Sequence, residues 1–203
     1  NAPINGSVPT ANISEVTLLE VYDKNISSLD GIEDFTALNY LSCFDNQLIS
    51  LDVTNNAALI QLNCSGNQLI SLDVSNNPAL DFLSCNTNQL TSLNISQNTA
   101  LTELDCIDNQ LTSLDLSNNA ALTYLEFQTN QLTTLDVSQN TNLTYLNCIN
   151  NQLTSLDLSN NTALTYLTCR FNQLTSLDVS QNNSLTALDC INNQLINLDV
   201  RNG

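Results

Sequence analysis

Eight aspartates recur along the chain at one repeated position, and they are the first residues whose spacing could do chemistry. They are Asp30, Asp52, Asp73, Asp115, Asp136, Asp157, Asp178 and Asp199, and Asn94 interrupts the series. Stacked carboxylates repel one another, and a column of oxygens can attract Ca²⁺. Aspartate also commonly accepts a hydrogen bond from the backbone N–H two residues further on, which Asn94 could do without the charge. The pattern therefore favours a structural turn, with weak Ca²⁺ binding as the lesser alternative.

The cysteines suggest a metal site or disulfides by their number but not by their spacing. They occur one per repeat, at Cys43, Cys64, Cys85, Cys106, Cys148, Cys169 and Cys190, and Phe127 takes the one missing place. A zinc site needs close pairs such as C-x₂-C, and the chain has none. Disulfide geometry wants Cβ atoms about 3.8 Å apart, whereas parallel neighbours lie about 4.8 Å apart. We predict a reduced column in the core and no metal.

Enzymatic chemistry finds little support in the sequence. There is no histidine to act as a general base, and four glycines leave no loop that could cradle a phosphate. Paired carboxylates such as Asp105 and Glu126 could imitate a glycosidase dyad, but they would lie on a flat row of strands without a cleft to exclude water. We predict that the protein is not an enzyme and uses no cofactor.

Charge and hydropathy exclude two further classes of partner. The 203 residues carry 20 acidic side chains against 3 basic ones, a formal net charge of -17. Binding to nucleic acid, or to an anionic lipid surface, needs clustered lysine and arginine. The chain also lacks an apolar run of about 18 residues, so we expect no membrane insertion.

A period of 21 residues explains the composition. Asn-Gln recurs at this spacing from Asn46 to Asn193, and columns of leucine, cysteine and asparagine keep the same phase. A fixed period of this size indicates stacked units that bury their apolar faces against each other. The turn asparagines could satisfy backbone groups of their own coil and of the next one. We predict a mostly β solenoid: short parallel strands stacked coil on coil, a second short strand or turn segment on the opposite side, and little or no helix.

The ends of the chain depart from this period. Val16, Leu19 and Val21 imitate the strand motif at a spacing of 22, which places one extra residue between Leu29 and Phe35. We therefore predict a leader over residues 1–15, a capping coil over 16–40 and an array of 21-residue coils over 41–203. Because the sequence stops half-way through a coil, we expect the natural protein to continue beyond Gly203.

The repeats resemble a known family. Leu59, Leu62, Cys64, Asn67 and Leu69 meet the rule L-x-x-L-x-L-x-x-N-x-L, as do the following coils. Together with the stretch ISSLDGIEDFTALNYLSC and coils of the LTSLDLSNN type, this resembles bacterial surface leucine-rich-repeat proteins with 21-residue repeats, as in secreted Bacteroidetes-like proteins, and more loosely the internalins. The resemblance implies an extracellular or cell-surface location and a protein or glycan partner there.

Aromatic residues gather where the period predicts solvent. If Leu62 and Cys64 point inward, residues 61, 63 and 65 of each coil point outward. Seven of the ten aromatics lie in such columns, which a demand for core packing cannot explain. The bland alternative is that tyrosine favours strands and stacks on its neighbours. As ligand-binding residues we predict Tyr40, Phe82, Glu103, Ile107, Tyr124, Tyr145, Ile149, Tyr166 and Arg170.

Three functions follow from these patterns. The first is a recognition or adhesion module that binds a protein, or less readily a glycan, through the aromatic-rich face. Its acidic side chains suit a basic or amphipathic partner. The second is a structural stalk or spacer without a ligand of its own. A minor third is ice binding by columns of threonine, which Ile49, Ile60 and Asp81 interrupt.

Overall fold

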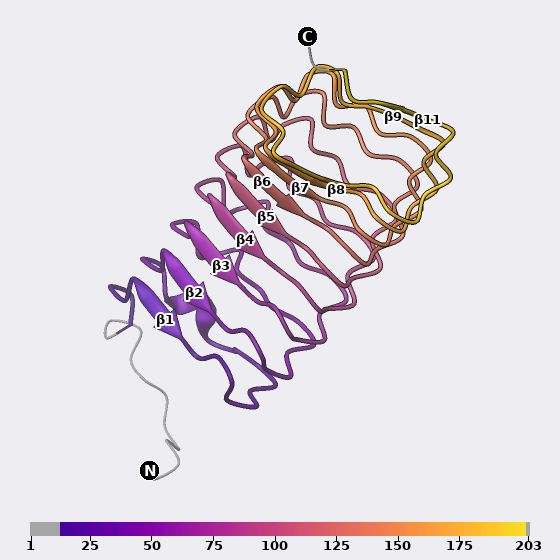
Figure 1. The fold of residues 1–203 in the computed structure, drawn as a ribbon. Helices are drawn as coiled ribbons and strands as arrows, with labels where there is room; N and C mark the ends of the chain where they lie inside the picture. The colour runs from indigo at the N-terminus through magenta and orange to yellow at the C-terminus, as the bar shows by residue number, and fades with distance from the viewer. Residues whose placement is uncertain (1–12, 202–203) are drawn as a thin grey trace.

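The structure is a computed structural model that describes residues 13–201, and these residues form a parallel β-solenoid. Each 21-residue coil contributes one three-residue strand to a long sheet along one side of the stack, and the first and last coils lie at opposite ends (Figure 1). The strands of the main sheet, in spatial order, are β1 (Leu18–Glu20), β2 (Tyr40–Ser42), β3 (Gln61–Asn63), β4 (Phe82–Ser84), β5 (Glu103–Asp105), β6 (Tyr124–Glu126), β7 (Tyr145–Asn147), β8 (Tyr166–Thr168) and β10 (Ala187–Asp189).

The opposite side of the coil carries the second, weaker ladder that the sequence predicts. There β9 (Ser176–Asp178) pairs in parallel with β11 (Asn197–Asp199), and Asp73 forms isolated bridges to Asp52 and Asn94. No α-helix occurs in residues 13–201, so the prediction of a mostly β solenoid with little or no helix is confirmed. None of the described residues form a helix that could cross a membrane.

Constant spacing in the sequence becomes constant register in space. Successive strands pair leucine with leucine, as Leu41 does with Leu62, because exactly one coil separates them along the chain. The first coil is one residue longer, yet Leu19 still pairs with Leu41. The extra length is taken up by η2, a single turn of 3₁₀ helix over Ile32–Asp34, which follows Gly31 at a φ of 94° that favours glycine.

The predicted leader lies largely in residues 1–12, outside the described residues. Of the part that is described, the turn at 13–15 leads directly into β1. The division into leader, capping coil and array stays a prediction.

The core is a set of apolar columns inside the coil. From β2 to β8 the leucines that point inward from the strands are fully buried, as are six of the seven cysteines and the single Phe127 that replaces one of them. Because each coil has apolar neighbours above and below, the core runs unbroken from Ile32 to Val179. A coil alone would leave two of its sides open, so its stability depends on its neighbours.

Two columns of buried asparagine connect the coils at their turns. In the first, Asn109 Nδ2 donates to the carbonyls of Cys106 and Ile107 in its own coil and of Cys85 in the preceding coil. Its Oδ1 accepts from the backbone N–H of Leu90, also in the preceding coil. The same pattern recurs along the array. The prediction that these amides bind the backbone of their own coil is confirmed, but their second partner is the preceding coil and not the next one.

The second column uses its amides differently. Asn119 Nδ2 donates to the carbonyls of Ile95 and Asn98, both in the preceding coil. The side chain is fully buried, and its Oδ1 has no hydrogen-bond partner in the protein. Both columns therefore satisfy the carbonyls of the coil that comes before them.

Candidate binding face

The outward side of the main sheet, which we call the sheet face, consists of three columns, named here by the residues of β3 and its flank. The 61 column and the 65 column are exposed or half-buried, as predicted. The prediction that the 63 column is also open to solvent is wrong for Ser42, Ser84, Asn147 and Thr168, which are buried. From β3 onward, the other members of this column are half-buried.

Three tyrosines of the 61 column form a continuous stack, the tyrosine ladder. The ring centroids of Tyr124 and Tyr145 lie 4.4 Å apart with 13° between their planes, and those of Tyr145 and Tyr166 lie 4.5 Å apart with 3°. This spacing follows from the register, which pairs the three residues on neighbouring parallel strands about 4.8 Å apart. The result is a face-to-face stack in which the rings hold one another in place.

Hydrogen bonds fix the polar edge of the ladder. The hydroxyl of Tyr145 donates to Glu126 Oε1 over 2.9 Å, and Asn147 Nδ2 donates to the same oxygen over 3.2 Å. Partial burial, followed by the contact with Glu126, raises the pKa of Tyr145 to about 12. Burial and Glu126 also raise the pKa of Tyr124. Both phenols therefore stay protonated at neutral pH and keep their hydroxyl hydrogens for donation.

The acidic residues near the ladder differ in their burial. Glu103 is exposed and occupies the 61 column beside Tyr124. Asp105 and Glu126 are register neighbours in the half-buried 63 column. Burial raises the pKa of Asp105, although a hydrogen bond from Asn86 Nδ2 opposes this shift. Residues 13–201 include no group of three or more side chains arranged to hold a metal ion.

The 65 column forms the flank of the ladder. Ile107 and Ile149 are half-buried there, and Arg170 pairs with Asp189 at 3.4 Å. Arg170 also lies 5.4 Å from the ring centroid of Phe171, an exposed residue that sequence reasoning missed. Phe171 adopts a φ of 53°, where other coils have Asp45, Asp108 or another small or polar residue. A bulky residue in this left-handed position is unusual. The contrast with the small or polar residues of the other coils could have identified Phe171 from the sequence.

The structure does not bring all the predicted site residues together. Glu103, Ile107, Ile149 and Arg170 surround the tyrosine ladder on β5 to β8 and their flank. Tyr40 and Phe82 lie on β2 and β4, where they line a separate pocket of about 150 Å³ with Gln61 and Asn63. Glu103 occupies the 61 column between the two groups, so the sheet face has two distinct aromatic areas.

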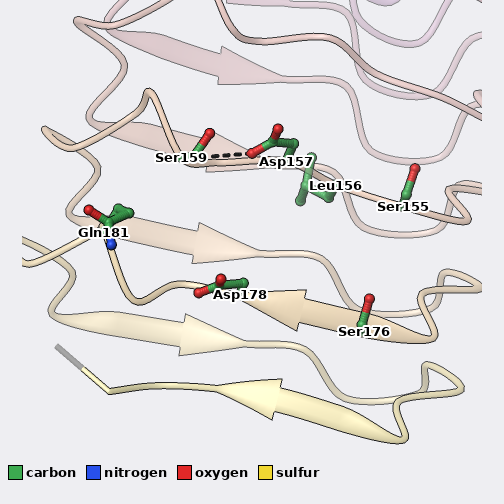
Figure 2. Close-up of a pocket in the computed structure, with 7 residues that line it drawn as sticks. All are labelled: Ser155, Leu156, Asp157, Ser159, Ser176, Asp178 and Gln181. Carbon is green, nitrogen blue, oxygen red and sulfur yellow. Dashed lines mark hydrogen bonds between the residues drawn. The ribbon is translucent and has the colours of Figure 1, made fainter.

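The aspartate column lies on the opposite side of the coil and forms turns. Asp157 Oδ1 accepts the backbone N–H of Ser159 over 3.0 Å (Figure 2). Asn94 makes the same bond to Ser96, as predicted from its place in the column. Such hydrogen bonds lower the pKa values of Asp115, Asp136 and Asp157.

A shallow pocket of about 240 Å³ lies along this column between two coils. Figure 2 shows Ser155 and Ser176 on neighbouring coils, with Asp157 and Asp178 beside them. A smaller pocket with the same kinds of residues recurs at Asp115 and Asp136. Because the feature repeats with the coil, it reflects the small side chains of the period rather than a unique site.

The cysteines are free, and six of the seven are buried, which confirms their predicted place in the core. Burial raises their pKa values, that of Cys43 to about 12, so they stay as thiols at neutral pH.

The threonine column at Thr102 uses its hydroxyls internally. Thr123 Oγ1 donates to the carbonyl of Thr102, and Thr144, Thr165 and Thr186 repeat this bond to the coil before them. Hydroxyls committed in this way are less free to order water, which counts against ice binding.

Comparisons with known proteins agree with this architecture. No protein-family model matches the chain, and no curated protein matches it. Among solved structures, a functional domain of InlJ from Listeria monocytogenes, described as including a cysteine ladder, is 34% identical over 94% of this chain, with a TM-score of 0.55. Internalin InlF from the same species is 26% identical over 96% of the chain, with a TM-score of 0.86.

A leucine-rich-repeat protein of Leptospira interrogans shares the fold, at 22% identity over 92% of this chain and 60% of its own, with a TM-score of 0.72. The chain spans 54% of the InlJ structure and 64% of the InlF structure. It is a leucine-rich-repeat solenoid similar to the bacterial internalins.

Proposed function

We propose that this chain is a non-enzymatic recognition module that binds a protein partner through the sheet face, at or outside a bacterial cell surface. The observation that carries the proposal is the tyrosine ladder of Tyr124, Tyr145 and Tyr166. Three aligned rings at solvent-facing positions offer a large contact area that loses little conformational entropy on binding. Aromatic residues of this kind are enriched where interfaces gain most of their affinity.

The surroundings of the ladder support a basic or amphipathic partner segment. Glu103, Asp105 and Glu126 add negative charge beside the rings, and the whole chain carries a net charge of -17. Complementary charge speeds encounter and rejects acidic partners, while the rings supply contact area. Ile107 and Ile149 give the flank an apolar strip against which the stem of a lysine or arginine could pack.

The likeness to internalins supports the class of function. Internalin-like modules typically bind proteins and typically lack enzymatic activity, and this chain shares their solenoid. Extracellular or cell-surface placement rests on the same likeness, and a Bacteroidetes-type origin of the repeats stays part of the proposal.

The test compares two variants on an array of purified bacterial and host cell-surface proteins. The first replaces the ladder by Tyr124→Ser, Tyr145→Ser and Tyr166→Ser. The matched control removes the other stacked pair, Tyr22 and Phe44, whose ring centroids lie 4.6 Å apart on the 65 column. A saturable partner should lose at least tenfold in affinity with the ladder variant and little with the control, and its association should slow as salt is added.

Thermal melting of both variants guards against misfolding. Because the rings are exposed or half-buried, the ladder variant should melt only a few degrees lower. A partner that binds the ladder variant as tightly as the unaltered chain would contradict the proposal. Finding no partner for the unaltered chain would favour a stalk or spacer.

A further inference from the structure

The first aromatic area of the sheet face differs from the tyrosine ladder in its charge. Strands β2, β3 and β4 contribute outward residues to three columns, and none of these nine residues is charged. They are Tyr40, Ser42, Phe44, Gln61, Asn63, Ser65, Phe82, Ser84 and Asn86. The next two strands, by contrast, present Glu103, Asp105 and Glu126. The face therefore divides into a neutral area and an acidic one.

An aromatic slot opens in the neutral area. Tyr40 and Phe82 occupy the 61 column two strands apart, with Gln61 between them, so their backbones are separated by about 9.6 Å. This is twice the spacing at which the rings of the tyrosine ladder touch. The space over Gln61 and Asn63 is the pocket of about 150 Å³, which is smaller than the 300–1,000 Å³ typical of drug-sized ligands. The slot has room for one ring.

The floor of the slot offers unused hydrogen-bonding groups. Asn63 Oδ1 accepts the backbone N–H of Ser65 over 3.1 Å, but within the described residues its Nδ2 has no partner. The exposed amide of Gln61 has none either, so it can both donate and accept. A ligand in the slot would thus meet two aromatic walls and a floor with at least two amide donors and one acceptor.

We infer that this slot binds one ring of a neutral sugar, as part of an oligosaccharide. A flat aromatic group in contact with both walls needs them about 7–8 Å apart, at carbon contacts of about 3.5–4.0 Å. A puckered ring with hydrogens on both faces is thicker and suits walls whose backbones are about 9.6 Å apart. Its hydroxyls match the free amides of Gln61 and Asn63. Because none of the residues that line the slot is charged, a neutral ligand can enter without stripping water from an ionised side chain.

The sugar site is independent of the protein-binding proposal. Its residues lie on β2 to β4, whereas the tyrosine ladder lies on β6 to β8. Either site could fail its test without affecting the other. Since an acidic sugar would face a chain of net charge -17, the slot should also prefer neutral sugars to charged ones.

The experiment titrates the chain with neutral tetrasaccharides of glucose, mannose and N-acetylglucosamine. Calorimetry measures binding, and tyrosine fluorescence follows it independently, because the chain has five tyrosines and no tryptophan. At least one neutral tetrasaccharide should bind saturably. Phe82→Ser and Gln61→Ala should each weaken it at least tenfold, while Tyr166→Ser, which removes a ring outside the slot, should leave it unchanged.

A second variant fills the slot without removing any side chain contact of the core. Gln61→Tyr would complete a run of three rings in the 61 column, as in the tyrosine ladder, and should fold normally while blocking the sugar. The inference is overturned if no neutral tetrasaccharide binds at millimolar concentration, or if Gln61→Tyr binds as well as the unaltered chain. It is overturned equally if free indole competes the sugar off at far lower concentration, which would assign the slot to an aromatic side chain of a protein.

Discussion

Asparagine does more than any other polar residue to join the coils of this molecule. An amide can donate and accept at once, so Asn109 donates to three carbonyls of two coils and also pairs the buried N–H of Leu90. Serine, with a shorter side chain, could not reach both coils. This explains why the residue recurs with the period although it contributes nothing to the apolar core.

Replacing one such amide should be costly. Asn109→Ala leaves the N–H of Leu90 without its partner in a buried turn, while the carbonyls of Cys85 and Cys106 keep the amides of Asn88 and Asn130. An unsatisfied buried group costs about 1–3 kcal/mol, so we expect a loss of roughly 1–3 kcal/mol in the free energy of unfolding. Urea denaturation measures it.

The control is Asn118→Ala, one residue before the buried Asn119. Asn118 is exposed, so its replacement should change the free energy of unfolding by less than about 0.5 kcal/mol. Equal losses in the two variants would show that the turn amides are dispensable.

Among the elements, the strands were the part most open to prediction from sequence. Alternation of Leu62 and Cys64 with polar neighbours identified the strand and its inward side, and the period of 21 fixed the register. Burial of the 63 column was not predictable in this way, because it depends on how far flanking side chains lean over Ser84 or Asn147. The bond from Tyr145 to Glu126 and the slot beside Gln61 likewise require side-chain positions that spacing does not contain.

The aspartate turn responds to pH with a definite sign. Hydrogen bonds from the side chain and backbone N–H of Ser138 lower the pKa of Asp136 in the folded state. A lowered pKa adds stability above the ordinary value near 3.8, and that stability is lost as the pH falls through the lower folded-state value. Asp136→Asn keeps the acceptor but does not titrate, as Asn94 shows in its own coil. Relative to the unaltered chain, the variant should therefore gain stability between pH 4 and pH 2.

The triple variant of Asp115, Asp136 and Asp157 to asparagine enlarges this difference, and melting temperatures at pH 7 and pH 2.5 measure it. Asp136→Ala serves as the control, because it removes the acceptor and should be less stable than the asparagine variant at both pH values. If the melting temperatures of the triple asparagine variant and the unaltered chain differ by the same amount at both pH values, the stability of the aspartate turn does not depend on ionisation.

At the scale of the whole molecule, charge opposes compactness. The chain carries a net charge of -17, and only two ion pairs, Arg170 with Asp189 and Arg201 with Asp199, occur in residues 13–201. Stacking one coil on the next brings like charges together, for example Asp115 beside Asp136, which raise each other's cost of ionisation. The core must overcome this repulsion at every coil interface.

Salt should therefore stabilise the solenoid. The screening length falls from about 30 Å at 0.01 M ionic strength to about 3 Å at 1 M, so melting temperature should rise by several degrees over this range of NaCl. CaCl₂ at matched ionic strength tests the alternative that the aspartate column binds Ca²⁺. If Ca²⁺ binds only as part of the ionic atmosphere, the two salts should give nearly the same curve. A saturable excess rise at low millimolar CaCl₂ would instead establish cation sites, and a fall in NaCl would contradict the role of repulsion.

The one-sided direction of the asparagine bonds has a consequence for how the chain is made. Asn109 accepts the N–H of Leu90 in the coil before it, so this buried N–H stays unpaired until the next coil arrives. Synthesis also runs from the amino end to the carboxyl end. A nascent chain can thus add coils one after another to a folded template. Each new coil completes the turn of the coil before it, so the direction of the asparagine hydrogen bonds matches the order of synthesis.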